Sequence, residues 1–373
     1  ADGKDGIQID DTAVGPDAWS SKHIVDMLCP PLEETGNPLQ CYPVANYPLG
    51  VTASWEPTQE GSAEPSPDNV RPIKGRDSVT VTRCGETLWS LDKITLQTYN
   101  SNITTKIDMD AVNLLPRNVQ LYFSGECSTG TLREVRFYDG TGAEIGTLRA
   151  NGGSSTVLKA GNIATVRLYA GLDENRERTC TNLQITLGTT APTAYAPYTG
   201  QTSTLTLPRT IYGGTVDAVT GEGQDIWITL TLNGTENITE KIPSQYSLKL
   251  KESSYSGMCS HFKSINNTEL QNNVTGVYLS YTALAIFNTH FSSLDEFKRY
   301  ARAQFEAGTP IQICYTRLPS TPNPTFTATG AQPIPALSGV NTVLTDADIL
   351  TVTGRADPIK RITDLEDAVA SMT

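Results

Sequence analysis

The feature that most constrains this chain is a succession of short apolar–polar alternations, separated by turns rich in glycine, asparagine and aspartate. In the segment 84–198, six alternating runs follow one another and no helical pattern stands between them. Their limits are 119–124, 132–138, 145–148, 156–158, 164–170 and 183–187. Alternation at every second residue is typical of strands with one buried face. The segment is therefore predicted to form an antiparallel sandwich of the jelly-roll type.

Composition limits the classes of protein and partner. The chain has 373 residues, of which 38% are hydrophobic, and this is enough for two or three domains with buried cores. Its 28 basic and 40 acidic residues give a net charge of −12, and the basic residues form no cluster along a predicted face. Nucleic acid is therefore not expected as a partner. No apolar run is long enough to cross a bilayer, so membrane insertion is not expected either.

The segment 199–318 carries one strong helix signal among further strands. Ser293 and Glu296 stand at the spacing of a capping box, and Gly308 ends the apolar pattern that follows. A helix over 293–307 is expected to pack on a sheet. Its buried face would consist of Leu294, Phe297, Ala301 and Phe305. The chain as a whole is thus expected to be a mainly β protein of several antiparallel sandwich modules with one packed helix.

Three further segments flank these two domains. Residues 1–15 are expected to be a linker or the end of a collagen-like stalk, since two glycines stand three residues apart. Residues 16–83 are expected to combine a short docking helix with a β segment, and residues 319–354 to form a closing β segment rich in proline and threonine. The threonine-rich strands at 199–222 and 325–354 resemble one another. Their pairing in one framework is a hypothesis.

The segment 355–373 shows the heptad spacing of a coiled coil. Asp357 is a good N-cap, and Pro358 suits the first helical position. The apolar seam consists of Ile362, Leu365, Val369 and Met372. A helix this short, with one narrow seam, needs partner helices to be stable. We therefore expect a coiled coil to begin here and to join copies of the chain into a homo-oligomer.

Seven cysteines are scattered along the chain without a CxxC pair. Buried free thiols are the first expectation for them. The alternative is a bridge between Cys29 and Cys41 across the proline-rich turn that separates them. Spacing alone does not decide between the two.

Combinations of catalytic residue types are few. Cys259 and His261 lie two residues apart, but no orienting third group accompanies them, so a nucleophilic pair is disfavoured. A zinc site that adds His290 lacks a fourth ligand, so no metal or cofactor is expected. Acidic pairs suited to glycoside hydrolysis occur at Asp108/Asp110, Asp173/Glu174 and Asp346/Asp348. Each pair lies in a predicted turn, where aspartate usually accepts backbone hydrogen bonds, so no catalytic residue is assigned and no enzyme is expected.

Aromatic side chains offer the one candidate binding surface. Flat aromatic rings with short polar side chains beside them are suited to stacking on the faces of sugar rings. The candidate glycan platform consists of Tyr122, Tyr138, Tyr169, Trp89 and Trp227. The three tyrosines lie on predicted strands of the segment 84–198 and are expected to line one face. The alternative for each of the five is an ordinary place in a sandwich core.

With these residues in view, the chain resembles tail and receptor-binding proteins of bacteriophages and prophages of gut Firmicutes. Three stretches carry the resemblance. The first is 18–30 with 59–62 and 65–73; the second is 183–188 with Tyr195-Ala-Pro-Tyr198 and 211–217; the third is 326–335 with Asn341-Thr-Val-Leu-Thr-Asp-Ala-Asp348 and 352–355. In the second stretch, Thr186 stands where an acidic residue is common.

The resemblance implies a structural virion protein at the phage tail tip, a fibre or receptor-binding subunit that assembles as a trimer with other tail and baseplate proteins. It implies sandwich modules, one of them similar to a carbohydrate-binding module, that attach the virion to a glycan or protein of the bacterial surface. The protein would then act in the virion, outside the cell. Two other functions fit the same modules: a secreted or wall-anchored bacterial adhesin, and a depolymerase that degrades the glycan it binds.

Overall fold

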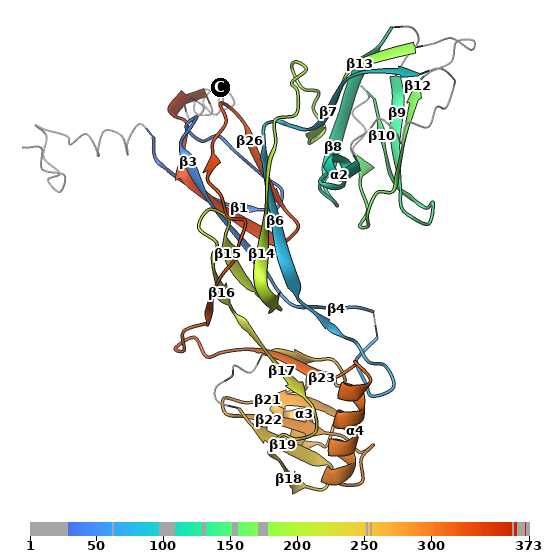
Figure 1. The fold of residues 1–373 in the computed structure, drawn as a ribbon, viewed down its shortest axis with the longest axis vertical. Coiled ribbons are helices and arrows are strands. Elements are labelled where there is room, and N and C mark those ends of the chain that lie inside the picture. Colours follow the sequence, from blue (N-terminus) through green and yellow to red (C-terminus); the bar gives the residue numbers. More distant parts are fainter. Residues whose placement is uncertain are drawn as a thin grey trace, which may run out of the picture.

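The predicted mainly β fold is confirmed, and its sheets are antiparallel (Figure 1). The computed structural model describes residues 29–61, 63–96, 109–128, 132–150, 156–170, 178–250, 253, 256–359, 362, 363 and 370. The expected stalk or linker at 1–15 and the expected docking helix that follows it lie outside these residues. The structure consists of three β-rich bodies: one is central, one lies beside its upper part and one lies below it (Figure 1).

The central body is a framework sandwich of two sheets. The first sheet has the order β1 (Pro31–Gly36), β27 (Ile349–Arg355), β3 (Pro48–Trp55), β15 (Gly214–Asp217), β16 (Glu222–Asp225) and β24 (Thr325–Thr327), with β25 (Ile334–Pro335) beside β3. The second has the order β14 (Gln201–Ile211), β6 (Arg76–Cys84), β26 (Asn341–Thr345) and β2 (Leu39–Cys41). Alternate residues of β3 are buried, so its apolar side chains face the second sheet. Val51, Leu350, Val79 and Val343 share the resulting core.

Three separate stretches of chain build this framework. The hypothesis that the threonine-rich segments 199–222 and 325–354 pair is confirmed, because Glu222 of β16 lies opposite Thr327 of β24 and Thr206 forms a bridge with Thr329. Two domains are inserted between neighbouring framework strands. The first insert follows β6 and returns at β14, where Arg83 lies opposite Gln201, and the second follows β16 and returns at β24. Each insert therefore leaves and re-enters the framework on a pair of antiparallel neighbours (Figure 1).

The first insert is an antiparallel sandwich, as predicted. One sheet has the order β11 (Thr156–Val157), β8 (Gln120–Cys127), β13 (Arg178–Leu187) and β7 (Thr87–Leu96); the other has the order β10 (Glu144–Arg149), β9 (Leu132–Tyr138) and β12 (Thr165–Ala170). The short helix α2 (Met109–Asn113) accompanies them. Leu121, Phe123, Phe137, Leu148 and Leu183 pack between the two sheets. Burial of these apolar faces is the main source of the insert's stability.

The expectation of buried free thiols holds for four of the seven cysteines, Cys29 is free but half-buried, and the expectation is wrong for the remaining two. Cys127 of β8 and Cys180 of β13 lie directly opposite each other and form a disulfide. Cys29 and Cys41 are both free, so the proposed bridge between them is absent. The pairing that occurs joins residues 53 positions apart, and only the register of two strands brings them together.

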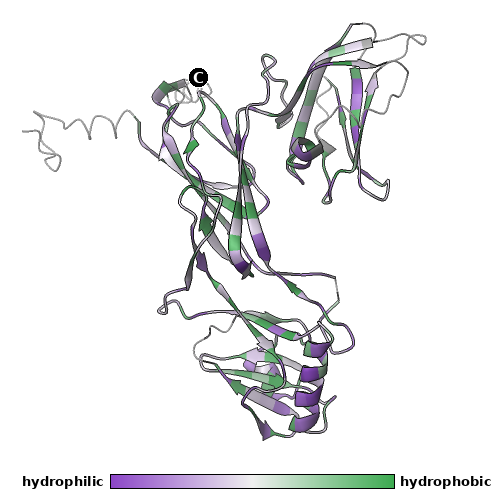
Figure 2. Cartoon of the chain, in the orientation of Figure 1, coloured by the Kyte–Doolittle hydropathy of each residue, from purple (hydrophilic) through white to green (hydrophobic). Residues whose placement is uncertain are grey.

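The second insert packs a helix on two small sheets. The sheets have the orders β17 (Trp227–Leu232), β23 (Ile311–Thr316), β20 (Gly257–Cys259) and β18 (Ile238–Ile242), β19 (Gln245–Lys249), β22 (Ala283–Phe287), β21 (Gly276–Leu279). The helices are α3 (Asn267–Gln271) and α4 (Leu294–Glu306). The ring of Phe297 in α4 stacks on Tyr246 of β19 with the ring centroids 4.7 Å apart. The outer face of α4 is hydrophilic (Figure 2).

The predicted helix at 293–307 is confirmed, with two corrections. Ser293 caps α4 by accepting a hydrogen bond from the backbone N–H of Glu296, but the Glu296 carboxylate accepts from Ser292 instead of Ser293, so the capping box is half formed. Phe297 and Ala301 are buried as expected. Phe305, in the last turn of α4, is 49% exposed and does not belong to the buried face.

A strap from the framework holds the second insert. The strap comprises residues 59–61 and 63–72, from the last residue of β4 (Thr58–Gln59) to the residue before β5 (Ile73–Lys74). The Arg71 guanidinium organises it by donating to the backbone carbonyls of Gln59, Glu60, Gly61 and Ala63. The backbone N–H of Arg71 donates to the Ser260 carbonyl at 2.8 Å, and the Gln59 amide donates to the Cys259 carbonyl at 3.0 Å. The strap thus attaches the insert to the framework at a site separate from the two chain connections.

The coiled coil stays a prediction. Of its four seam residues only Ile362 is among the described residues, in a short helical stretch, and its side chain is 56% exposed. Ile359, one turn earlier, is 73% exposed. The other three, Leu365, Val369 and Met372, lie outside the part of the chain that the structure describes.

Candidate functional site

The outer face of the sheet β10-β9-β12 in the first insert carries a grid of polar and aromatic side chains. Strand register places the grid in three rows: Glu144, Tyr138 and Thr165; Thr147, Arg136 and Arg167; Arg149, Glu134 and Tyr169. The alternating partners on β9 and β12, such as Val135, Phe137, Val166 and Leu168, are buried in the core. Strand alternation therefore turns the grid residues outward, and all of them are half-buried or exposed. We call this surface the tyrosine–arginine face.

Two arginine–tyrosine pairs cross this face diagonally. The Arg136 guanidinium carbon lies 4.9 Å from the centroid of the Tyr169 ring, and that of Arg167 lies 4.6 Å from the centroid of the Tyr138 ring. Both distances are within cation–π range. Burial, and then a hydrogen bond with Tyr169, raise the pKa of the Tyr138 hydroxyl, so the Tyr138 ring stays a neutral phenol at neutral pH. The two strands thus present two rings whose orientation is held by charged neighbours.

The two arginines differ in their charged partners. Arg136 donates from Nε to the Glu134 carboxylate at 2.7 Å and lies 3.8 Å from Glu144, and the hydrogen bond with Glu134 raises the pKa of Arg136. Arg167, directly opposite, has no carboxylate partner within the described part of the chain, and its Nε is buried without an acceptor. Like charges directly opposite each other on neighbouring strands repel. The face therefore holds an unneutralised cation at its centre.

A hollow of about 420 Å³ continues this face past the edge strand β10. Glu144, Thr147 and Arg149 of the grid line it, together with Val157 of β11 and Lys159 just after that strand. Val157 is 40% exposed there. The hollow adds an apolar contact and a further cation to the tyrosine–arginine face.

The predicted platform is divided by the structure. Tyr138 and Tyr169 lie together on this face, as the alternation of their strands suggested. Tyr122 lies on β8 of the opposite sheet, so the expectation that the three tyrosines share one face is wrong. Trp89 is 7% exposed and belongs to the core of the first insert. Trp227 opens β17 in the second insert, beside Gly213 of the framework.

The outer face of the opposite sheet is covered by the chain itself. The Gln184 side chain of β13 donates to the Ala194 carbonyl and accepts from the Ala196 backbone N–H, both at 3.2 Å. Ser90 of β7 accepts from the backbone N–H of Tyr198 at 2.8 Å. These bonds hold the segment 194–198 across the sheet. Of the two outer faces of this sandwich, the tyrosine–arginine face is therefore the open one.

A signal for the missed arginines is present in the chain. Both strands carry the same three-residue pattern, Arg136-Phe-Tyr138 and Arg167-Leu-Tyr169, with the apolar residue in the core. An Arg-x-Tyr repeat on two neighbouring antiparallel strands places each arginine diagonally opposite the other strand's tyrosine. Reading both residues of the pattern, and not the aromatic one alone, identifies the surface.

The Cys259–His261 pair is enclosed in the second insert. Cys259 is 1% exposed and His261 is fully buried. Burial raises the pKa of the Cys259 thiol to about 12 and lowers that of the His261 imidazole to about 4, so both are neutral at neutral pH. His290 lies on the surface, 3.4 Å from Asp68 of the strap. Within the described residues, no three or more His, Cys, Asp or Glu side chains are grouped so that they could hold a metal ion.

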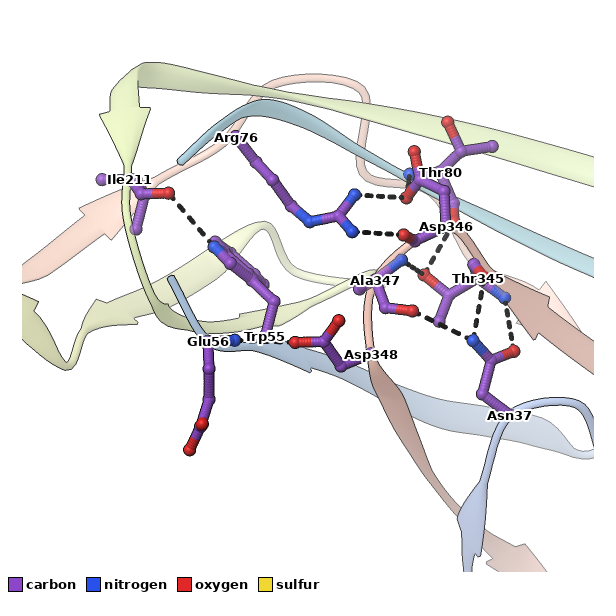
Figure 3. A network of polar contacts seen from close by, with 10 residues as sticks. All are labelled: Asn37, Trp55, Glu56, Arg76, Thr80, Ile211, Thr345, Asp346, Ala347 and Asp348. Carbon is purple, nitrogen blue, oxygen red and sulfur yellow. Dashed lines mark hydrogen bonds and ion pairs between the residues drawn. The ribbon is translucent and has the colours of Figure 1, made fainter. Parts of the chain in front are cut away.

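The acidic pair Asp346/Asp348 binds backbone amides in the framework (Figure 3). Asp346 accepts from the Thr80 N–H of one sheet at 2.9 Å, and Asp348 accepts from the Glu56 N–H at the end of β3 in the other sheet at 2.8 Å. Asn37 donates to two carbonyls of the same turn. The turn between β26 and β27 thereby ties the two sheets together. Of the other pairs, Asp110 is described and engaged, while Asp108, Asp173 and Glu174 lie outside the described residues.

A second hollow, of about 410 Å³, lies between the framework and the first insert. Its polar lining is engaged in local hydrogen bonds. Asn113 bonds the backbone of Ile163 through both its oxygen and its nitrogen, and Arg117 donates to the Gly161 carbonyl. The Asn37 side chain donates to the carbonyls of Thr345 and Ala347 in the turn between β26 and β27. This hollow therefore offers fewer unengaged polar groups than the tyrosine–arginine face.

Comparison with protein-family models, with curated proteins and with solved structures finds no match to this chain. Among the described helices, none is both long and apolar enough to span a bilayer.

Proposed function

We propose that the chain is a non-enzymatic structural subunit of a bacteriophage tail, a fibre or receptor-binding protein, and that its first insert attaches the virion to a bacterial surface glycan. The observation that carries the proposal is the tyrosine–arginine face, where Tyr138 and Tyr169 stand together on the open side of a sandwich. The resemblance to tail proteins supplies the biological setting. Cys259 and His261 are enclosed in a core, and the carboxylates of Asp346 and Asp348 accept backbone hydrogen bonds. Both observations support a role in binding without catalysis.

A jelly roll similar to a carbohydrate-binding module is the architecture that we propose for this insert. The rings of Tyr138 and Tyr169 and the neighbouring hydroxyls of Thr147 and Thr165 provide stacking surfaces and short polar groups side by side. Shallow, open surfaces of this kind suit a polymer that extends past both edges of the sheet. We therefore favour a polysaccharide over a small sugar and over a surface protein.

The disulfide of the first insert supports a site of action outside the cell. Disulfides persist in secreted and virion proteins, whereas the cytosol keeps thiols reduced. Cys127 and Cys180 join the two central strands of the sheet behind the tyrosine–arginine face. The domain proposed to meet the host is thus the one that carries the cross-link.

Assembly into a trimer is the second part of the proposal. Exposed Ile359 and Ile362 continue the heptad seam at the end of the chain, and a coiled coil of three copies would cover them. Three linked binding faces would raise the avidity for a repeating polymer by a factor of about 100 or more. Light scattering on the full chain after size-exclusion chromatography should give three times the monomer mass. A strict monomer at micromolar concentration would contradict the assembly but not the binding face.

The tyrosines are expected to be needed for binding. Tyr138→Ala and Tyr169→Ala should each weaken binding to host-wall polysaccharide by about tenfold, because each removes one stacking surface. Biolayer interferometry with immobilised polysaccharide from candidate hosts measures this. Tyr47→Ala, which removes a 41% exposed tyrosine of the framework, is the matched control and should bind like the wild-type chain. If all three variants bind equally, the face is not the binding site.

A further inference from the structure

The charges of the tyrosine–arginine face are opposite to those of the molecule. The whole chain has a net charge of −12. Among the described residues, the face and the hollow beside it combine four cationic side chains, Arg136, Arg149, Arg167 and Lys159, with the two carboxylates Glu134 and Glu144. A local excess of positive charge on an acidic protein attracts anionic partners and keeps them away from the rest of the surface.

The arrangement around Arg167 indicates that the ligand is charged. Its guanidinium is held over the Tyr138 ring, and no carboxylate neutralises it within the described residues. Its Nε is shielded from solvent without an acceptor, which is costly for a charged group. Arg136 directly opposite adds a like charge. An anionic group bound between the two strands would reduce this repulsion and would accept the charge-assisted hydrogen bonds that guanidinium groups form with carboxylates and phosphates.

The two tyrosines stand at opposite corners of the same arginine pair. Tyr138 lies in the first row of the grid and Tyr169 in the third, with Arg136 and Arg167 in the row between them. A polymer that stacks sugar rings on both tyrosines must therefore pass over the arginine row. Along the other direction, Arg149 and Lys159 line the hollow beyond β10. Cations thus stand at the centre and at one edge of the path.

We propose that the ligand of the tyrosine–arginine face is an anionic glycopolymer, whose carboxylate or phosphodiester groups are bound by Arg167 and Arg136 while its sugar or polyol units contact Tyr138 and Tyr169. This inference rests on the proposed glycan-binding function and specifies its ligand class. Acidic sugar residues and polyol phosphates share this chemistry.

Binding of three defined polymers to the full chain tests the inference: polygalacturonate as the carboxylate probe, poly(glycerol phosphate) as the phosphodiester probe and dextran as the neutral probe. At least one polyanion should bind about tenfold or more tightly than dextran, and a rise from 50 to 500 mM salt should weaken that binding, since exposed charges are screened. Arg167→Gln should lower the affinity for the polyanion by about tenfold or more. Arg167→Lys, which keeps the charge without the planar fork, should lower it less. The polyanion that binds shows which anionic group is recognised.

Arg302→Gln is the matched control, because this exposed arginine of α4 also lies in a basic hollow but belongs to the second insert. It should leave binding unchanged; an equal loss in Arg302→Gln would show non-specific attraction and overturn the inference. Suppose that dextran binds as tightly as the polyanions, and that its binding is weakened by Tyr138→Ala but not by Arg167→Gln. This result would contradict an anionic ligand and leave the proposed function standing. Binding of none of the three polymers, together with host-wall binding that is unaffected by Tyr138→Ala, would refute both.

Discussion

Replacing Cys127 and Cys180 with alanine is expected to lower the free energy of unfolding of the first insert by about 4 kcal/mol. The bond closes a loop across a sequence separation of 53 residues, and a loop of that length confers about this much by restricting the unfolded chain. Hydrogen exchange of peptides from β8 and β13 measures the loss. Amides that exchange only through unfolding of the insert should exchange about 1,000 times faster. Reduction of the wild-type chain should reproduce the change without any substitution.

The control for this experiment is Cys29→Ala, which removes a free, half-buried cysteine. It should leave exchange in the first insert unchanged. Exchange in the second insert should also be unchanged in the double variant, since a separate core stabilises that domain. If the double variant and the wild-type chain exchange within threefold of one another in β8 and β13, the disulfide contributes nothing measurable.

Mild acid is expected to destabilise the second insert through His261. Burial lowers its pKa in the folded protein to about 4, from the ordinary value of 6.5 that applies in the unfolded chain. The unfolded state therefore binds a proton below pH 6.5 while the folded state does not, so the stability that the neutral imidazole confers is complete above pH 6.5 and declines as the pH falls towards 4. Between pH 6.5 and 5, above the range in which most carboxylates titrate, the free energy of unfolding should fall by about 2 kcal/mol.

Hydrogen exchange of peptides from β19, β22 and α4, corrected for the intrinsic pH dependence of exchange, measures this fall. His261→Leu removes the titrating group and should flatten the pH dependence over this interval. His290→Ala, which changes the surface histidine beside Asp68, should keep the wild-type slope. If the wild-type stability does not change between pH 6.5 and 5, the pKa of His261 is the same in the folded and unfolded states, and the prediction is wrong.

Local patterns account for most of the secondary structure. The alternating runs at 132–138 and 164–170 became β9 and β12, since strand alternation is a property of neighbouring residues. Ser293 and the spacing of Phe297 and Ala301 likewise located α4. What local patterns do not contain is the assembly of three distant stretches into one framework. Only the similar threonine-rich alternation of the segments 199–222 and 325–354 indicated that distant stretches pair.

The candidate site shows the same limit. Period-two alternation indicates that Tyr122, Tyr138 and Tyr169 stand on strands, but it does not say which of the two sheets a strand joins or whether the chain covers that sheet. The segment 194–198 covers the sheet of Tyr122, which leaves Tyr138 and Tyr169 on the open side. The Cys127–Cys180 bridge also depends on register, so its partners are not evident from spacing.

The paired connections of both inserts have a consequence for how such a protein can change. Each insert departs from and returns to residues that already face each other across a ladder, Arg83 with Gln201 and Gln224 with Thr325. A hairpin turn of a few residues would close either gap without moving a framework strand. Recombination at these two places would therefore exchange a whole domain while the core stays as it is. The framework and each inserted domain are thereby encoded in separable parts of one gene.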